Sequence, residues 1–253
     1  MSTLQVTLSI IVPAYNEGLD VKRSIQTYVD AARNTPLIDK FEIFAIDDGS
    51  SDDTYDRMLE IASKVKEVTL IKNSRNLGLS ATYKKVIPKC MYEYVNLAYG
   101  FTPYDSNILS KLYQRLGRAD IISGYISTDS AETRGLVRYY ISRCFVQFLN
   151  IMFRLSVYYY NGQTVFKKKD LLSVDLFSTR SGAQAEIIIK LMAKHHTIQE
   201  VELPQNVWRS STRRSSSSKS SNYFLVLGLI LHLFFNIYIK PLVSKQRIKA
   251  HNK

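Results

Sequence analysis

Residues 8–17 form the stretch LSIIVPAYNE, from which the fold can be inferred. Its first five residues, Leu8–Val12, form a short apolar run of the kind found in strands that are buried on both faces. A polar tip follows it at residues 13–17. Residues 41–50, FEIFAIDDGS, repeat the arrangement, with an apolar run and then a polar tip. Because one helical pattern separates the two runs, we expect neighbouring parallel strands whose polar tips meet at one edge of a sheet.

Strand and helix patterns continue to alternate along the first two thirds of the chain. We predict strands at residues 8–12, 41–46, 68–71, 94–98, 119–124, 165–167 and 198–203. We predict helices at residues 20–34, 51–65, 79–89, 105–116, 136–155 and 183–194, with Ser51 as the N-cap of the second. This order predicts an α/β fold, a three-layer αβα sandwich around a mainly parallel sheet.

Charge is distributed unevenly along the 253 residues, whose formal net charge is +12. No acidic residue follows Glu202, and residues 209–253 hold nine of the Arg and Lys residues. This asymmetry indicates an anionic partner for the C-terminal part, either a nucleic acid or an anionic membrane surface. No recognised nucleic-acid-binding fold is present and the basic tail adjoins an apolar segment, so we expect no nucleic-acid partner. Two cysteines are too few for a disulfide framework.

Two segments have the composition of helices that contact a membrane. Residues 223–239 are almost wholly apolar, and 17 helical residues reach roughly 26 Å, the lower limit for crossing a bilayer. Basic residues flank both ends, so a span, an in-plane anchor and an ordinary buried helix all remain open. Residues 136–155 either pack on the sheet or lie at a membrane surface. Residues 1–5 are short and polar, and we expect no signal peptide.

The two polar tips carry side chains suited to binding a nucleoside. Tyr15 can stack on a base, while Glu17 and Asp47 can accept hydrogen bonds from base N–H or ribose hydroxyl groups. No G-x-G-x-x-G or P-loop motif is present, so side chains rather than a glycine cradle would form the pocket. The alternative is that Asp48 and Gly49 only make a turn.

Three motifs resemble the donor-binding half of family-two glycosyltransferases with the GT-A fold: residues 9–17 (SIIVPAYNE), 46–54 (IDDGSSDDT) and 73–81 (NSRNLGLSA). Weaker similarities point to the polyprenyl-phosphate branch, typified by dolichol-phosphate mannose synthase. They are residues 138–143 (RYYISR), 161–166 (NGQTVF), Glu186, 201–204 (VELP) and 213–219 (RRSSSSK).

The resemblance implies an inverting glycosyltransferase that moves a sugar from a nucleotide sugar to a lipid-linked acceptor, most simply a polyprenyl phosphate. It would work at the cytoplasmic face of a membrane, held there peripherally or by a single C-terminal anchor. The domains would be a catalytic domain (residues 1–208), a basic Ser-rich loop (209–222) and an apolar helix with a basic tail (223–253). The implied donor-binding residues are Pro13, Tyr15, Glu17, Asp47, Asp48, Arg75 and Asn96. The implied catalytic residues are Arg138, Glu186, Arg213 and Lys219.

One departure from the family concerns the metal. Relatives follow strand four with an Asp-x-Asp pair that holds a divalent cation on the donor diphosphate, whereas residues 96–103 read NLAYGFTP. Mg²⁺ and Mn²⁺ prefer carboxylate ligands, so the sequence supports no metal site there. Either the cation is dispensable, with Arg138, Arg213 and Lys219 around the phosphates, or the chain binds its donor without transferring the sugar.

The acceptor decides whether a base is needed. A polyprenyl phosphate is already an oxyanion and requires none, whereas a hydroxyl acceptor on a surface glycan would require one. Glu186 is the carboxylate placed to serve as that base, to contact the substrate, or only to pack within its helix.

Overall fold

The computed structural model describes residues 5–18, 20–102, 104–126, 136–178, 182–204 and 221–240. Seven strands form one sheet in the order β3-β2-β1-β4-β6-β5-β7. They are β1 (Val6–Ala14), β2 (Ile38–Asp47), β3 (Val68–Lys72), β4 (Tyr94–Leu97), β5 (Ile121–Ile126), β6 (Gln163–Lys167) and β7 (Ile198–Leu203). All neighbouring pairs are parallel except those that β6 makes with β4 and β5. The predicted mainly parallel sheet is therefore confirmed.

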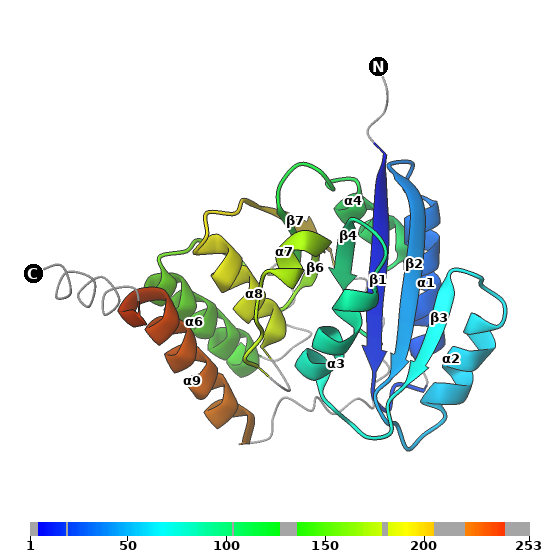
Figure 1. The fold of residues 1–253 in the computed structure, drawn as a ribbon, viewed down its shortest axis with the longest axis horizontal. Coiled ribbons are helices and arrows are strands. Elements are labelled where there is room, and N and C mark those ends of the chain that lie inside the picture. The colour runs from blue at the N-terminus through cyan, green and yellow to red at the C-terminus, as the bar shows by residue number, and fades with distance from the viewer. Residues whose placement is uncertain are drawn as a thin grey trace, which may run out of the picture.

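Helices cover both faces of the sheet and complete the predicted three layers (Figure 1). One face carries α1 (Val21–Arg33), α2 (Thr54–Ala62) and α4 (Ser106–Tyr113). The other carries α3 (Leu79–Val86), α6 (Leu136–Phe153), α7 (Lys168–Leu172), α8 (Ala183–Met192) and α9 (Ser221–Phe234). A 3₁₀ turn, Ile87–Lys89, extends α3, and a π-helical turn, Phe235–Ile239, extends α9.

The apolar run of β1 supplies both layers of the core. Ile10 and Val12 belong to the cluster under α1 and α4, while Ile11 belongs to the cluster under α3 and α8. Successive side chains of a strand point to opposite faces, so an uninterrupted apolar run is what a strand covered on both sides requires. All three side chains are fully buried.

The predicted elements differ from the observed ones mainly at their ends. Helix α2 begins three residues later than predicted, after Asp53, so Ser51 is not its N-cap. The backbone N–H of Ser51 instead donates to Asn16 Oδ1. Asp105 is an N-cap, because its side chain accepts a hydrogen bond from the N–H of Ile108 and starts α4. Helix α7 is too short for a helical period to reveal and was not predicted.

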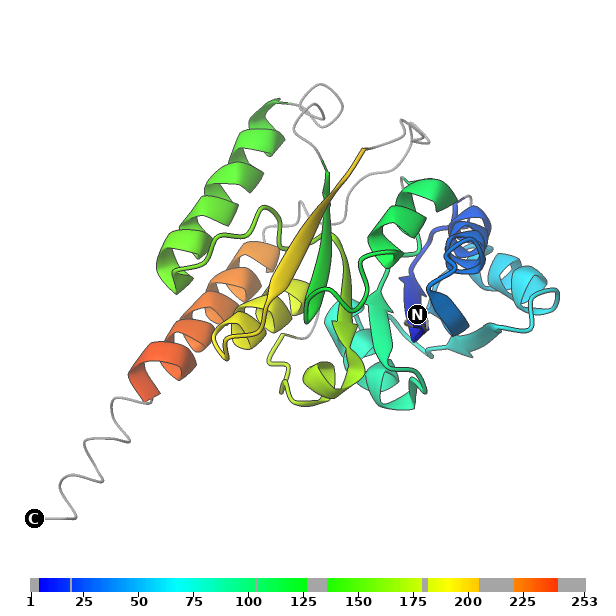
Figure 2. The same ribbon diagram turned by 90° about the horizontal axis from the view of Figure 1, so that it is seen from above.

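Helices α6 and α9 lie side by side at the end of the molecule farthest from α1 and α2 (Figure 2). On α9, Leu229, Ile230 and Leu233 are buried in the core cluster, whereas Leu227 and Leu231 are exposed. Helix α9 is thus half buried. This position is intermediate between the buried helix and the membrane anchor that the sequence left open. Among the described residues, no helix is both long enough and apolar enough to span a membrane. The predicted loop at residues 209–222 falls almost entirely outside the described residues.

Candidate functional site

Six strand ends share one edge of the sheet. Strands β3, β2, β1 and β4 are parallel to one another, and antiparallel β6 brings β5 and β7 back into the same direction. The carboxyl ends of these six strands therefore meet at one edge, together with the start of β6 at Gln163. Ligands of open α/β sheets bind at such an edge. We call it the carboxyl edge.

The tips of β1 and β2 are joined at this edge, as predicted. Ala14 pairs with Asp47 in the sheet, and the N–H of Asp48 donates to the carbonyl of Ala14 at 2.8 Å. Beyond the strands, the N–H of Asn16 donates to Ser50 Oγ at 3.0 Å. Asn16 has a φ of 54°, a left-handed conformation that asparagine tolerates better than most residues. Hydrogen bonds thus set the distance between the two tips.

The carboxylate of Asp47 is only partly used as a hydrogen-bond acceptor. Its side chain is fully buried, and one carboxylate oxygen accepts a hydrogen bond from the N–H of Ser50 at 3.0 Å. The other oxygen, Oδ2, is buried without a hydrogen-bond partner among the described residues. A buried carboxylate oxygen without a donor is costly, so a ligand N–H or O–H at this point would relieve a real penalty.

Asp48 differs, because its carboxylate is already occupied. Its oxygens accept hydrogen bonds from the backbone N–H groups of Leu77 and Gly78 at 3.0 and 2.9 Å, and from the side chains of Asn73 and Thr82 at 2.8 and 3.2 Å. The predicted direct contact of Asp48 with the donor stays a prediction. Asp48 shapes the segment that follows β3.

Arg75 belongs to that segment and lies beside the joined tips. Gly49 has a φ of +75°, and a Cβ at this glycine would lie 2.5 Å from the backbone carbon of Arg75. Only glycine allows the two backbones to approach this closely. The Arg75 side chain is exposed. Gly49 and Asp48 together therefore hold the backbone of Arg75 beside the joined tips.

The remaining donor-site residues of β1 take different positions. Pro13 is buried, and its carbonyl accepts the N–H of Gly100 at 2.9 Å. Tyr15 is 47 % exposed, so its ring is available for stacking. Glu17 is half-buried, and its backbone N–H donates to Thr54 Oγ1 at 2.8 Å.

Asn96 is the penultimate residue of β4, and its predicted contact with the donor stays a prediction. It lies within β4, fully buried. Its amide nitrogen donates to the carbonyl of Thr164 at 3.0 Å, and its amide oxygen accepts the hydroxyl of Tyr113 at 3.0 Å. Both polar atoms of the Asn96 amide are thus hydrogen-bonded inside the core, and a strand pattern alone does not predict these partners.

Hydrogen bonds of two tyrosines, which were not among the predicted site residues, hold the segment that follows β4. The hydroxyl of Tyr28 accepts from the N–H of Tyr99 and from Gln163 Nε2, and donates to the carbonyl of Tyr99. The Tyr99 hydroxyl donates to Gln184 Oε1. Burial raises the pKa of Tyr28 to about 12 and that of Tyr99 well above its usual value, so both phenols stay neutral. Tyr99 lies in the segment where the family pattern leads one to expect acids. This departure from the pattern is the sequence signal that could have drawn attention to the tyrosines.

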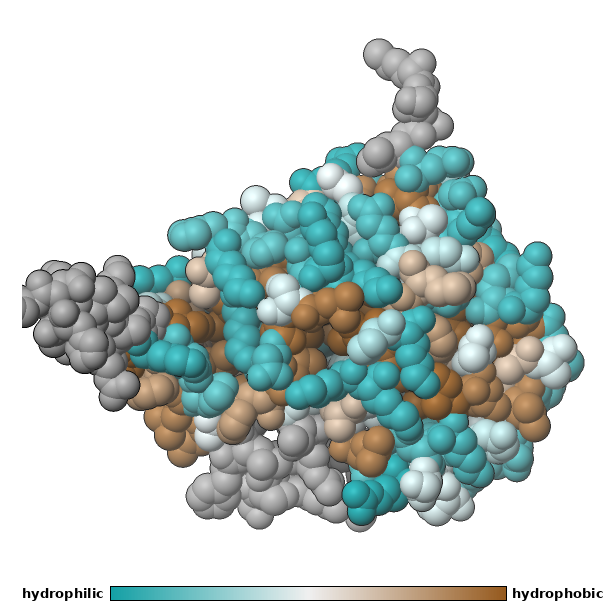
Figure 3. All heavy atoms as spheres, viewed as in Figure 1, coloured by the Kyte–Doolittle hydropathy of each residue, from teal (hydrophilic) through white to brown (hydrophobic). Residues whose placement is uncertain are grey.

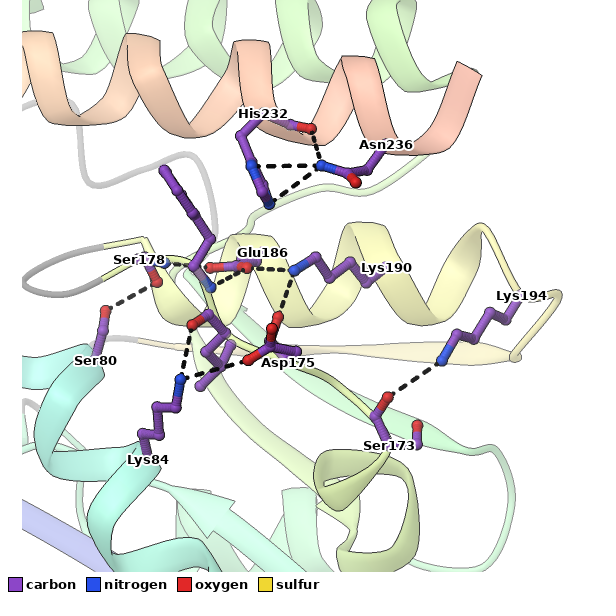
Figure 4. A network of polar contacts seen from close by, with 12 residues as sticks. Ser80, Lys84, Ser173, Asp175, Ser178, Glu186, Lys190, Lys194, His232 and Asn236 are labelled. Atoms are coloured by element: carbon purple, nitrogen blue, oxygen red, sulfur yellow. Dashed lines mark hydrogen bonds and ion pairs between the residues drawn. The ribbon is translucent and has the colours of Figure 1, made fainter. Parts of the chain in front are cut away.

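Glu186 is a structural carboxylate on α8 (Figure 4). It is fully buried and accepts hydrogen bonds from the N–H groups of Phe177 and Ser178 at 2.7 and 2.9 Å. Lys190 Nζ lies 2.5 Å from Oε1. Burial works against the charged form, but the bonds from Lys190, Phe177 and Ser178 outweigh it and lower the pKa of Glu186. Three donors thus hold the carboxylate in place, and the predicted substrate contact and base role of Glu186 stay predictions.

The contacts of Glu186 extend to two other helices. Ser178 Oγ donates to Ser80 Oγ of α3 at 3.2 Å, and the ring of Phe177 stacks on His232 of α9 at 3.9 Å between ring centres. Glu186 therefore stabilises the segment that links α3, α8 and α9.

The predicted cations of the C-terminal half are not positioned by this structure. Arg138 belongs to the first turn of α6, but its side chain is outside the described residues, as are Arg213 and Lys219 in full. Strand β7 ends at the carboxyl edge, immediately before the undescribed segment that contains Arg213 and Lys219.

Among the described residues, one group of three side chains has ligand atoms close enough to hold a metal ion: Asp120, Asp170 and His196. It lies at the opposite end of the sheet, before the starts of β5 and β7. Asp120 already accepts hydrogen bonds from Lys167 Nζ at 3.0 Å and from the N–H and hydroxyl of Thr197 at 2.9 and 2.8 Å. This group is remote from the joined tips.

Comparison with known proteins agrees with this geometry. Residues 9–98, which contain most of β1, all of β2 to β4 and both tips, match the family model described as "Glycosyl transferase family 2". A 77-residue stretch is 39 % identical to the "Putative glycosyltransferase CsbB" of Bacillus subtilis, covering 30 % of this chain and 23 % of that protein. A 111-residue stretch is 35 % identical to the "Cholesterol galactosyltransferase" of Borreliella burgdorferi, covering 43 % and 28 %. The chain thus spans about a quarter of the length of these relatives.

Similarity to solved structures extends over most of the chain. Glucosyl-3-phosphoglycerate synthase from Mycobacterium tuberculosis, solved in complex with Mn²⁺, UDP-glucose and phosphoglyceric acid, aligns with a TM-score of 0.67. The alignment covers 90 % of this chain and 80 % of that one at 16 % sequence identity. The fold is therefore the GT-A fold expected from the motifs.

Proposed function

We propose, from the family 2 match of residues 9–98, that this chain is a glycosyltransferase whose nucleotide-sugar donor binds at the joined tips of β1 and β2. The observation that carries the proposal is the buried, unpartnered Oδ2 of Asp47 at that point. Base N–H and ribose hydroxyl groups are the donors that it would accept. Tyr15 supplies an exposed ring for the base and Arg75 a cation for the phosphates.

The transfer itself follows from the geometry of substitution. The acceptor oxygen attacks the anomeric carbon from the face opposite the nucleoside diphosphate, the new C–O bond forms, and the old one breaks with its electrons going to the diphosphate. One displacement inverts the configuration at this carbon. The leaving group needs positive charge at its phosphates, and we assign that task to Arg75 with Arg138, Arg213 and Lys219.

A polyprenyl phosphate is the acceptor that we favour, because it requires no base. Glu186, the predicted alternative base, is engaged by two backbone N–H groups and Lys190. A hydroxyl acceptor is the second candidate, and the similarity to a cholesterol galactosyltransferase supports it. In that case the base would have to be another residue.

The cytoplasmic face of a membrane is the proposed location. Along α6, Ile141, Phe148 and Ile151 form an exposed stripe at spacings of seven and three, and Ile151 is 79 % exposed. Exposed Leu227 and Leu231 continue the apolar surface on α9, and hydrophobic side chains are visible where α9 lies in Figure 3. We call the exposed residues Ile141, Phe148, Ile151, Leu227 and Leu231 the apolar face. A surface of this kind, lying on two helices, suits in-plane contact with lipid.

Basic side chains stand next to the apolar face. A cavity of about 490 Å³ beside α6 is lined by residues that include Arg143, Asn150 and Arg154. Guanidinium groups next to exposed apolar side chains favour anionic headgroups and the phosphate of a lipid-linked acceptor.

A transfer assay tests the proposal. The full chain is incubated with radiolabelled UDP- and GDP-sugars and with either undecaprenyl phosphate or cholesterol in mixed micelles. We expect label in the polyprenyl phosphate and its loss with Asp47→Asn. Label in cholesterol alone would select the second candidate, and nucleotide binding without transfer to either lipid would select a noncatalytic donor-binding protein.

A further inference from the structure

We infer that the donor site binds its nucleoside diphosphate without a divalent cation, because neutral side chains and close backbone packing fill the position of the Asp-x-Asp pair. This inference rests on the proposed function and specifies the chemistry of the same site. It concerns the segment Ala98–Gly100, directly after β4.

Packing of Gly100 against β1 leaves no room for a side chain. A Cβ at this position would lie 2.4 Å from the Cβ of Ala14, 2.9 Å from its Cα and 3.0 Å from the carbonyl oxygen of Pro13. The N–H of Gly100 also donates to that carbonyl at 2.9 Å, which fixes the approach. A carboxylate at position 100 would therefore require β1 or the segment to move.

The other two positions of the segment offer no anionic ligand. Ala98 is fully buried, and its carbonyl accepts the hydroxyl of Tyr83 at 2.5 Å. Tyr99 directs its hydroxyl to Gln184 and remains neutral, since burial raises its pKa well above the usual value. Mg²⁺ and Mn²⁺ in nucleotide sites are held by one or two carboxylates beside the substrate phosphates. The observed set is an alanine, a neutral phenol and a glycine, which does not fit such an ion.

The nearby carboxylates of the described residues do not replace the missing pair. Asp48 is saturated by four donors, and Asp105 caps α4. The group formed by Asp120, Asp170 and His196 lies at the far end of the sheet. Among these carboxylates Asp47 offers one oxygen, and a single ligand does not form a hard-cation site.

Positive charge at the phosphates then has to come from side chains. Arg75 is exposed beside Gly49, at the joined tips. Two neighbouring lysines are engaged, since Lys85 Nζ donates to Asn73 Oδ1 at 2.7 Å and Lys84 pairs with Asp175 at 3.4 Å. A guanidinium can bind two phosphate oxygens at once and stays charged at every physiological pH. Arg75 is the described residue that would supply part of the positive charge that a divalent cation provides in other sites.

Calorimetric titration tests the inference. The full chain is titrated with UDP, GDP and UDP-glucose, once in EDTA and once in Mn²⁺. We expect dissociation constants that differ less than threefold between the two conditions, and weakening by threefold or more in EDTA would overturn the inference. If none of the three probes binds in either condition, the proposed nucleotide site itself is wrong.

Two arginine variants test whether Arg75 supplies the positive charge at the phosphates. Arg75→Ala should weaken UDP binding about tenfold or more, and equally in EDTA and in Mn²⁺. Arg118→Ala is the matched control, because Arg118 is also exposed but lies before β5, at the opposite end of the sheet. UDP binding that is unchanged by Arg75→Ala would remove this arginine from the site. Binding by Arg75→Ala that Mn²⁺ restores would show that a cation does act there.

Discussion

The side chain of Asn16, beyond β1, accepts a hydrogen bond from the backbone N–H of Ser51, beyond β2, at 2.9 Å. This bond joins two loops that are 35 residues apart in the sequence. It sets the separation of Tyr15 and Asp47, the two residues proposed to hold the base and the ribose of the donor.

Asn16→Ala should weaken nucleotide binding. Alanine loses the bond to Ser51, worth about 1 kcal/mol, and adopts the left-handed conformation at a further cost of roughly 1–2 kcal/mol. We expect a lower melting temperature together with a UDP dissociation constant at least tenfold higher. His195→Ala is the control, because His195 has a similar φ of 65° and lies before β7, far from the tips. If both variants lose stability and neither loses affinity, Asn16 does not organise the site.

Asp47→Asn should weaken nucleotide binding, whereas Asp48→Asn should lower the stability of the fold. Asp47→Asn can replace Oδ2, the oxygen that no described residue uses, with an amide nitrogen that cannot accept a hydrogen bond, and a hydrogen bond to a carboxylate contributes about 1.5–3 kcal/mol, or roughly 10- to 150-fold in affinity. Its melting temperature should stay close to that of the parent. Asp48→Asn should instead lower the free energy of unfolding by about 1–3 kcal/mol, because donors of the segment after β3 lose their acceptor. The reverse pattern in calorimetry and thermal denaturation would exchange the two roles.

Glu186→Gln should affect stability and leave the chemical step intact. The amide cannot accept the bonds from Phe177, Ser178 and Lys190 together, so the free energy of unfolding should fall by about 1–3 kcal/mol. At a temperature where the variant is folded, transfer should stay within a few-fold of the parent. A loss above a hundredfold at unchanged melting temperature would restore Glu186 as a general base.

Acid should weaken the link between the starts of β5 and β7. The backbone N–H of Thr197 and the ammonium group of Lys167 hold the pKa of Asp120 well below its usual range. A carboxyl whose pKa is lowered on folding stabilises the protein above its unfolded pKa of about 3.9, and that contribution is lost as the pH falls through the folded value. Asp120→Asn should therefore melt below the parent at pH 7, and the gap should narrow below about pH 4. A gap that is constant from pH 7 to pH 3 would contradict this.

Charge on the apolar face should weaken membrane binding. Ile151→Asp and Leu231→Asp place a carboxylate on exposed positions of α6 and α9, so folding should be unaffected. Each should reduce co-sedimentation with vesicles of phosphatidylcholine and phosphatidylglycerol several-fold, because an acid is repelled by anionic lipid and costly to bury. Leu59→Asp, an exposed position on α2 at the other end of the molecule, is the control. Equal vesicle binding by all three variants and the parent would exclude the apolar face as a membrane contact.

The sequence predicted the joined tips because their cause is local. An apolar run that ends in polar residues defines the end of a buried strand, and two such runs separated by one helix most often form parallel neighbours. The pairing of Ala14 with Asp47 follows from that rule. The donor-site motifs lie on these strands, so their positions could be read without knowledge of the rest of the fold.

The roles of individual polar side chains could not be read in the same way. Asp47 and Asp48 are adjacent acids in the sequence, yet one keeps a free buried oxygen and the other binds four donors. The difference depends on the segment after β3, whose backbone and side-chain donors reach the carboxylate of Asp48. Asn96 and Glu186 have partners within the protein, Tyr113 and Lys190, that the sequence pattern did not predict.

The layers of the fold, the parallel strands that meet at the carboxyl edge and the lack of acids in residues 96–103 could be read from the chain, because periodicity and residue type are local properties. Folding was needed to show which polar atoms at that edge have no partner among the described residues, and that Gly100 lies too close to Ala14 to be replaced by an acid. Hydrogen bonding and close packing depend on groups that are distant in the sequence, and they exist only once the chain has folded.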